Sequence, residues 1–331
     1  MHATVELPTR LAHRLKDLST LPESVRHNDS VGRVKQWYEK SFGELAVFAD
    51  LWKDKQSDAI TIQEWTKLTD VLKTIAKRHQ PVATTLAEGF HRHIATHPEN
   101  DARDDSLQEF LDRFHLSRIG MRTTSTQHLT LLGQTAAVTQ RRDGYCGIIE
   151  HEMNIPQVLQ KAAADARQVC VDYYGISTAP QVQMDLPDNL AVTYIPGYLW
   201  HIAFEILKNS MRAIVETFEE PYAPIAISLI DDADNVVIKI SDQGGGIPAK
   251  QADLVWRYMY TTANSPYSPS EAEEQIENAA ERAIMAGFGY GLPISRLYAK
   301  FCGGTVTLQN HESRGVDCMI ILPKVCKDQE A

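Results

Sequence analysis

Three short segments in the second half of this 331-residue chain, one polar and two rich in glycine, constrain its fold more than any other feature. They are Glu205–Asn209 inside a helical apolar pattern, Asp242–Gly246 at the end of an alternating strand, and Gly287–Pro293 before a second helical pattern. Each segment supplies a different part of nucleotide chemistry. Together they predict an α/β domain in which one divided ATP site is built from three distant pieces.

The first segment places four polar residues on one edge of a half-apolar helix, since a helix advances about 100° per residue: His201, Glu205, Asn209 and Arg212. An asparagine oxygen suits Mg²⁺, which takes few protein ligands besides phosphate oxygens and water. The Glu205 carboxylate, one turn earlier, could accept a proton from a nucleophile or orient water. A solvated helix face is the alternative for this segment taken alone.

The second segment ends a strand with an acidic residue and three glycines, a run that strand interiors do not tolerate. A carboxylate only accepts hydrogen bonds, so Asp242 suits an exocyclic amine such as that of adenine. Gly244 and Gly246 allow the backbone to approach a base closely. A tight turn without a ligand is the alternative.

The third segment alternates glycine with larger residues before Pro293, which is well placed in the first turn of a helix. Such an entry presents free backbone N–H groups to phosphate. The spacing matches neither the P-loop nor the dinucleotide pattern, and a plain flexible loop is the alternative. The residues predicted to hold the nucleotide here are Gly287, Phe288, Gly289, Tyr290, Gly291 and Leu292.

The residues in and around these segments resemble those of a known protein family. EILKNSMRAIVET (205–217), KISDQGGGIP (239–248) and GFGYGLPISRLYAK (287–300) resemble the GHKL ATPase/kinase superfamily and, within it, pyruvate dehydrogenase kinase and branched-chain α-ketoacid dehydrogenase kinase. FLDRFHLSRIGMR from Phe110 agrees, and the resemblance covers nearly the whole chain. It implies an ATP- and Mg²⁺-dependent protein-serine kinase that inactivates a mitochondrial 2-oxoacid dehydrogenase, with pyruvate dehydrogenase favoured and the branched-chain enzyme as the alternative.

The same resemblance implies roles for single residues. Glu205 is expected to be the general base and His201 the residue that tunes it. Asn209 is expected to bind Mg²⁺, Arg212 to contact phosphate, and Thr262 to contact the nucleotide at the hinge of a lid. One position departs from the family pattern, because Val316 stands where relatives have a threonine whose hydroxyl lies near adenine.

A second site is implied in the N-terminal half, where six residues match positions that bind pyruvate-like inhibitors in the family: Tyr38, Ser41, His79, Ser117, Arg118 and Arg122. The two arginines, four apart on one helix face, can converge on one carboxylate. A structural ion-pair cluster is the alternative. Ala76 stands where a further arginine is expected, which leaves room for a more apolar keto acid.

Two domains are expected. Residues 1–140 carry the helical stripes of an antiparallel four-helix bundle, and residues 141–331 alternate strands with helices, as in an α/β sandwich with helices on one face of a mixed sheet. The resemblance identifies the first as a regulatory and lipoyl-docking domain. It identifies the second as a GHKL (Bergerat-type) ATP-binding kinase domain, with an ATP lid at about 261–290.

Composition narrows the partners. The net charge of −10, without a long basic run, argues against nucleic acid. No stretch of about 18 apolar residues predicts a membrane span, and five cysteines without metal-ligand spacing suit a reducing compartment. The resemblance implies a homodimer in the mitochondrial matrix that docks on the lipoyl domain of an acyltransferase core. It also implies a presequence ahead of Met1 and, in many relatives, an Asp-Trp tail, neither of which this chain contains.

Functions of other classes stay open. A nucleotide-binding scaffold, or a GHKL ATPase without kinase activity, would keep the ATP site. A bacterial-type histidine kinase would need a phospho-acceptor histidine followed by glutamate; His151-Glu152 is the nearest match, but the usual Arg-Thr-Pro sequel is missing.

Overall fold

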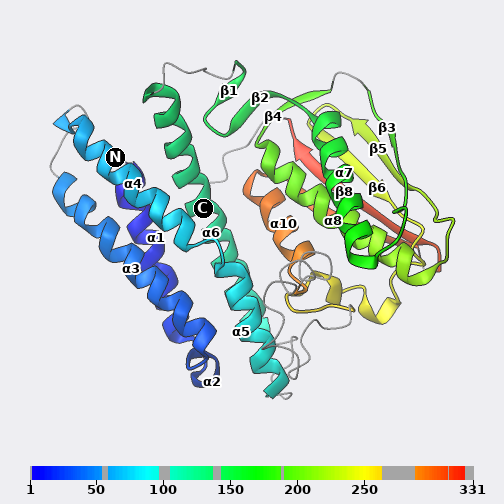
Figure 1. The fold of residues 1–331 in the computed structure, drawn as a ribbon, viewed down its shortest axis with the longest axis horizontal. Helices are drawn as coiled ribbons and strands as arrows, with labels where there is room; N and C mark the ends of the chain where they lie inside the picture. Colours follow the sequence, from blue (N-terminus) through cyan, green and yellow to red (C-terminus); the bar gives the residue numbers. More distant parts are fainter. Residues whose placement is uncertain are drawn as a thin grey trace. The chain divides into compact units, whose positions relative to one another are not determined.

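The computed structural model describes residues 2–53, 59–96, 105–136, 143–187, 190–262, 288–311 and 313–324. The chain divides into two compact units, Met1–Ile148 and Ile149–Ala331, which are described in turn (Figure 1). The first unit is helical in its described residues apart from the short strand β1 (Tyr145–Cys146). The second combines a mixed sheet with helices.

The helical unit is built from long amphipathic helices: α1 (His2–Thr20), α3 (Asp29–Trp52), α4 (Ile62–Arg78), α5 (Val82–Thr96) and α6 (Asp105–Ala136), with a single turn α2 (Glu23–Arg26) between the first two. α1 packs on α3 and α6, and α4 packs on the same two helices (Figure 1). The predicted helical bundle is therefore confirmed. Residues 79–81 interrupt one helical stretch and divide it into α4 and α5.

Local signals explain where these helices begin. The Asn28 side chain accepts a hydrogen bond from the Ser30 N–H at the start of α3. Thr61 and Glu64 form a reciprocal capping box at the start of α4, which satisfies two backbone donors that no helical carbonyl reaches. The interior is apolar, with Leu72 and Phe114 fully buried.

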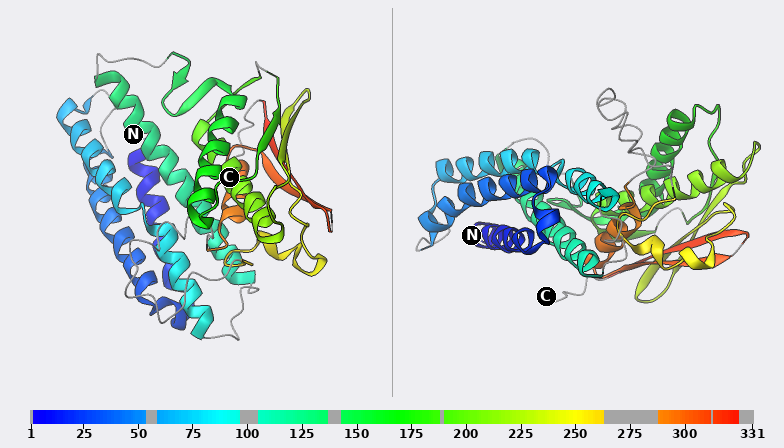
Figure 2. Two further views of the ribbon diagram at one scale, coloured as in Figure 1. Left: turned by 45° about the vertical axis from the view of Figure 1, so that its right-hand side comes forward. Right: turned by 90° about the horizontal axis from the view of Figure 1, so that it is seen from below.

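The second unit is the predicted α/β sandwich. Its five-stranded sheet has the order β3 (Val182–Asp185), β5 (Ile225–Asp231), β6 (Asn235–Ser241), β8 (Gly315–Pro323), β7 (Thr305–His311). β3 and β5 are parallel and the other neighbours are antiparallel. The helices α7 (Ile155–Tyr174), α8 (Pro196–Thr217) and α10 (Gly291–Phe301) lie on one side of the sheet, the green and orange helices beside the yellow and red strands in Figure 2.

Some strands depart from the single mixed sheet that was expected. β4 (Ala191–Tyr194) pairs with β2 (Ile149–Asn154) in a separate small sheet instead of joining the main one. β2 and β3 are not predicted from the sequence. Both have few strongly β-forming residues, so their pairing depends on neighbours that are distant in the chain.

The register of the main sheet positions the second polar segment. Val236, Ile238 and Ile240 are buried on the helix-covered face of β6, which ends at Ser241. Ser241 is paired with Asp317 of β8, and the Asp242 N–H donates to the Val316 carbonyl at 3.0 Å. Asp242 is thereby fixed where the sheet ends, beside β8. Two short 3-10 turns, η2 (Ala249–Gln251) and η3 (Leu254–Trp256), follow.

Candidate functional site

A cavity of about 370 Å³ in the second unit is walled by all three polar segments. From α8 come Glu205, Asn209 and Arg212, and from the end of β6 come Asp242, Gly244 and Gly246. The third part of the wall is Gly289, Gly291 and Leu292 at the start of α10, together with Thr262. The fold therefore brings together residues that are about 80 positions apart in sequence, as a divided site requires.

Other predicted residues lie behind this wall or outside the described residues. The His201 ring packs edge-on against Tyr298 of α10, with 4.8 Å between ring centroids, one turn before Glu205. Tyr290 is buried against Tyr258, and Phe288 is half-buried; neither lines the cavity. Gly287 and residues 263–287 of the expected lid lie outside the described residues.

Glu205 sits where two elements meet. Lys208 on the same helix places its Nζ 3.0 Å from Glu205 Oε1, and the lysine side chain is only 5% exposed. The other carboxylate oxygen, Oε2, faces Gly291, where a Cβ atom would collide with it. Only glycine at the start of α10 lets the carboxylate lie this close to the helix N-terminus.

The start of α10 suits a phosphate group. Gly289 has φ +73°, in the left-handed region, and a Cβ there would collide with the Tyr260 carbonyl oxygen. The Tyr290 side chain at the N-cap makes no capping hydrogen bond, and the helix dipole favours negative charge at this end, so the first N–H groups of α10 suit an anion.

Asp242 is held by a network of three donors. Its Oδ1 accepts from the Gly244 N–H at 3.0 Å and the Val316 N–H at 3.2 Å, and its Oδ2 accepts from the Ser210 hydroxyl at 2.7 Å. Burial raises the pKa of Asp242, and these hydrogen bonds oppose that rise. Cys318 is buried and also lines the cavity; burial and the nearby Asp242 charge raise the pKa of its thiol.

Arg212 links α8 to Thr262, which lies in the described first residues of the expected lid. Its Nη2 donates to Thr262 Oγ1 at 2.5 Å, and its Nε lies 3.6 Å from a Glu216 oxygen. Glu216 in turn accepts from the Tyr174 hydroxyl at 2.8 Å. The guanidinium is thereby held at the edge of the cavity.

Lys208 and Ser210 are among the polar wall residues that are missing from the sequence-based prediction. Lys208 stands three positions after Glu205, a spacing at which helical side chains meet, and this was the available signal. Ser210 carried no local signal, because its bond to Asp242 joins residues 32 positions apart.

A metal would find few ligands here. Among the described residues, no group of three or more His, Cys, Asp or Glu side chains is placed to bind a metal ion. Asn209 supplies one neutral oxygen in the cavity wall. This donor set fits Mg²⁺, which binds with one or two protein ligands when phosphates and water complete its shell.

The helical unit contains a second cavity of about 230 Å³. Three of the six predicted effector residues line it: His79, Arg118 and Arg122. Ala76 and several leucines complete the apolar part of the wall. Arg118 is 8% exposed and donates to the carbonyl of His79 at 3.1 Å, whereas Arg122 is exposed. The remaining predicted residues do not reach the wall: Tyr38, Ser41 and Ser117.

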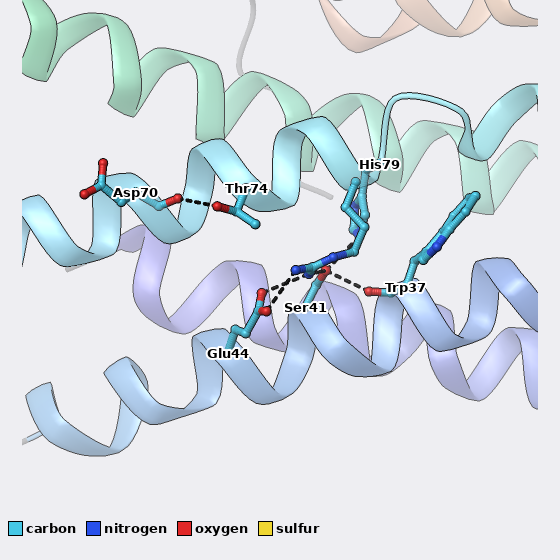
Figure 3. Close-up of polar contacts among 7 residues, drawn as sticks. Trp37, Ser41, Glu44, Asp70, Thr74 and His79 are labelled. Carbon is cyan, nitrogen blue, oxygen red and sulfur yellow. Dashed lines mark hydrogen bonds and ion pairs between the residues drawn. The ribbon is translucent and has the colours of Figure 1, made fainter.

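Behind His79 lies a buried polar cluster (Figure 3). The Ser41 Oγ is 2.9 Å from His79 Nε2 and donates to the Trp37 carbonyl at 2.7 Å. Arg78 donates to the same hydroxyl and to both carboxylate oxygens of Glu44, each at 2.8 Å. Burial lowers the pKa of His79 to about 4, with neighbouring arginines adding to the effect, so its ring is neutral at pH 7.

None of the helices in the described part of the chain has the length and apolarity to cross a membrane.

Comparison with known proteins assigns both units. Residues 2–150 match the family model of "Mitochondrial branched-chain alpha-ketoacid dehydrogenase kinase", and residues 196–325 match that of "Histidine kinase-, DNA gyrase B-, and HSP90-like ATPase".

Relatives that match nearly the whole of this chain point to the same family. The isozyme 1 [pyruvate dehydrogenase (acetyl-transferring)] kinase of Mus musculus is 35% identical over 96% of this chain and 70% of its own length. The corresponding kinase of Drosophila melanogaster is 34% identical over 96% and 75%, and that of Arabidopsis thaliana 33% over 98% and 84%. The cavity, its ATPase motifs and these matches together show that the chain is an ATP-binding protein kinase and belongs to the family of mitochondrial pyruvate and branched-chain α-ketoacid dehydrogenase kinases.

Proposed function

We propose that this kinase phosphorylates a serine of the dehydrogenase component of a mitochondrial 2-oxoacid dehydrogenase complex and thereby inactivates that component. Pyruvate dehydrogenase is the first candidate, because the whole-length relatives carry its name. The branched-chain enzyme is the alternative, because the model matching residues 2–150 carries that name. The observation that carries the proposal is the Glu205 carboxylate, which lies on the cavity wall against the first residue of α10.

The chemistry follows from this placement. As the serine oxygen bonds to the γ-phosphorus, Glu205 accepts the hydroxyl proton, and the bond from phosphorus to the bridging oxygen of ADP breaks. Lys208, 3.0 Å from Glu205 Oε1, holds the carboxylate in the cavity. His201, packed on Tyr298, is the neighbour that sets the position of the Glu205 turn. No phosphorylated protein intermediate is needed.

The nucleotide is held along the wall. Asp242 accepts a hydrogen bond from the amine of adenine. Gly244 and Gly246 border the base, and Arg212 contacts phosphate. The N–H groups at Gly289, Gly291 and Leu292 bind the phosphates at the N-terminus of α10. Asn209 would hold Mg²⁺, and the metal would supply positive charge beside the phosphates.

The direct test is phosphorylation with ATP and Mg²⁺ of purified pyruvate and branched-chain dehydrogenase components, each supplied with its lipoyl-bearing core. Glu205→Gln removes the base, and we expect at least a 100-fold loss of label with ATP affinity retained. Glu219→Gln, an exposed glutamate just beyond α8, is the matched control. ATP binding without transfer to either component would favour the scaffold instead.

We further propose that the second cavity binds a 2-oxo acid effector. Arg118 and Arg122 would hold the carboxylate, and Tyr38, Ser41, His79 and Ser117 would support the site. Leucines and Ala76 in the wall favour a branched apolar tail. Inhibition by pyruvate and by 4-methyl-2-oxopentanoate should weaken in Arg118→Gln. It should be unchanged in Arg113→Gln, a charge on the same helix that is not in the cavity wall. Equal weakening in both variants would exclude this site.

Partners and location complete the proposal. We propose a homodimer in the mitochondrial matrix that docks on the lipoyl domain of the acyltransferase core, in keeping with the mitochondrial names of the relatives. Light scattering of the purified chain tests the dimer. Co-sedimentation with an isolated lipoylated domain, against the same domain without lipoate, tests the docking.

A further inference from the structure

Most hydrogen-bond acceptor positions of the Asp242 carboxylate are filled by donors of the protein itself. A carboxylate offers about four acceptor positions, and three are filled by the Gly244 N–H, the Val316 N–H and the Ser210 hydroxyl. Both backbone donors go to Oδ1, whereas in the described part of the chain Ser210 is the one donor to Oδ2. One position therefore faces a ligand, and its direction is set by where the other three donors stand.

Ser210 is the only side-chain donor among these three bonds. It lies on α8 directly after Asn209, is 5% exposed, and lines the same cavity as Asp242. The side chain of Val316 cannot contribute a hydroxyl, although its N–H does donate. The same cavity wall includes the apolar side chains of Ile247, Leu308 and Val316, which suit a flat base.

From this geometry we infer that Ser210 is a positioning residue for base recognition: its hydroxyl orients Asp242 Oδ2 toward the exocyclic amine of adenine, and so makes the kinase select a 6-aminopurine. The inference rests on the role proposed above for Asp242. When a base covers the carboxylate, Oδ2 loses its hydrogen bonds to water. The hydrogen bond from Ser210 replaces part of that loss. A 6-oxopurine would instead bring a second acceptor against the carboxylate.

The test uses a pair of nucleotides that differ only in the amine. Dissociation constants are measured for ATP and for purine riboside 5′-triphosphate, which has hydrogen at position 6. In Ser210→Ala we expect ATP to bind about 3- to 10-fold more weakly, and the analogue to change by less than about two-fold. Ser210→Thr, which keeps the hydroxyl, should restore most of the ATP affinity.

Two outcomes would overturn the inference. Equal weakening of both nucleotides in Ser210→Ala would mean that the hydroxyl only supports the structure, and unchanged ATP binding would mean that it has no role. Asp242→Asn, measured in parallel, separates this failure from that of the proposed site. If Asp242→Asn lowers the preference for ATP over the analogue while Ser210→Ala does not, only the Ser210 role is lost. If neither does, the Asp242 assignment falls too, and because only binding is measured, kinase activity is judged independently.

Discussion

The two units each contain a glutamate paired with a basic residue, and the two pairs are built differently: Glu205 and Lys208 line a cavity, whereas Glu44 and Arg78 do not. Arg78 bonds both oxygens of Glu44 and a third partner, Ser41. Lys208 contacts one oxygen of Glu205, and the second oxygen faces the start of α10. The first arrangement uses the planar fork of arginine to fix both partners. The second leaves a carboxylate oxygen directed at the N-terminus of α10, where we propose that phosphate binds.

This difference suggests a rule for separating structural from reactive ion pairs. A pair whose oxygens are all bonded by protein groups contributes to stability. A pair that retains an open carboxylate oxygen on a cavity wall contributes to function. The following changes test that rule, beginning with the largest expected effect.

Lys208→Met should lower kcat by about 10- to 100-fold, because Glu205 loses the cation that holds it in the cavity. The free energy of unfolding should change little, since methionine fills the space of the lysine stem. Steady-state kinetics and chemical denaturation measure the two quantities. Lys161→Met, an exposed lysine on α7, is the control. A large stability loss with normal kcat would make this pair structural and contradict the rule.

Arg78→Met should lower the free energy of unfolding by about 2 kcal/mol, because Glu44 and Ser41 lose a shared charged donor. Adding Glu44→Leu should recover part of this loss, since no carboxylate is then left without its partner. Urea denaturation of the two variants provides the measurement. If the double variant is less stable than the single one by the full cost of a second independent change, the two residues do not act as a pair.

Acid should weaken the helical unit through His79. Its pKa in the folded state is lowered to about 4, below the unfolded value of about 6.5, so the unfolded chain binds protons first as pH falls. The free energy of unfolding therefore has its full value above about pH 6.5, and it decreases progressively as the pH falls toward 4. At pH 5.5 the loss should reach about 1 kcal/mol.

Urea denaturation at pH 7.5 and 5.5 measures this loss, and His79→Gln should show a smaller difference between the two pH values than the parent chain. Arg118, Arg78 and Glu44 are the charged groups that act on the ring. His13→Gln, a change at an exposed histidine on α1, should keep the full difference. An unchanged pH difference in His79→Gln would show that other groups cause the acid sensitivity.

Thr262→Val should have the smallest effect. It removes the hydroxyl that accepts from Arg212, and ATP affinity should fall by about two- to three-fold because the guanidinium is less well held. Thr305→Val, at an exposed position of β7, controls for the loss of a surface hydroxyl. Equilibrium binding of ATP is the readout, and a tighter complex in Thr262→Val would mean that Thr262 competes with phosphate for Arg212.

Much of this architecture could be predicted from local patterns. The stripe of polar residues along α8 predicts that Glu205, Asn209 and Arg212 share a surface, and they line one cavity. The alternating apolar residues of β6 predict where the strand ends and hence where Asp242 emerges. These features follow from periodicities of 3.6 and 2 residues, which a single segment carries by itself.

Other features depend on contacts that no local pattern encodes. The Arg78–Glu44 pair joins residues 34 positions apart. A lysine in an apolar helix extends to solvent as often as it pairs, so Lys208 was not identified. Tyr38 and Ser41 were expected on the wall of the second cavity, but His79 stands between them and the cavity, stacked on the tyrosine ring at 4.6 Å.

The raised pKa of Cys318 has a consequence for the durability of the enzyme. The thiolate is the form of cysteine that reacts with peroxides and electrophiles, and here burial together with the Asp242 charge keeps the sulfur protonated. A reactive thiolate in the wall of this cavity would be a point of oxidative inactivation. Burial, with a smaller contribution from the carboxylate at the end of the sheet, thus protects the cavity wall.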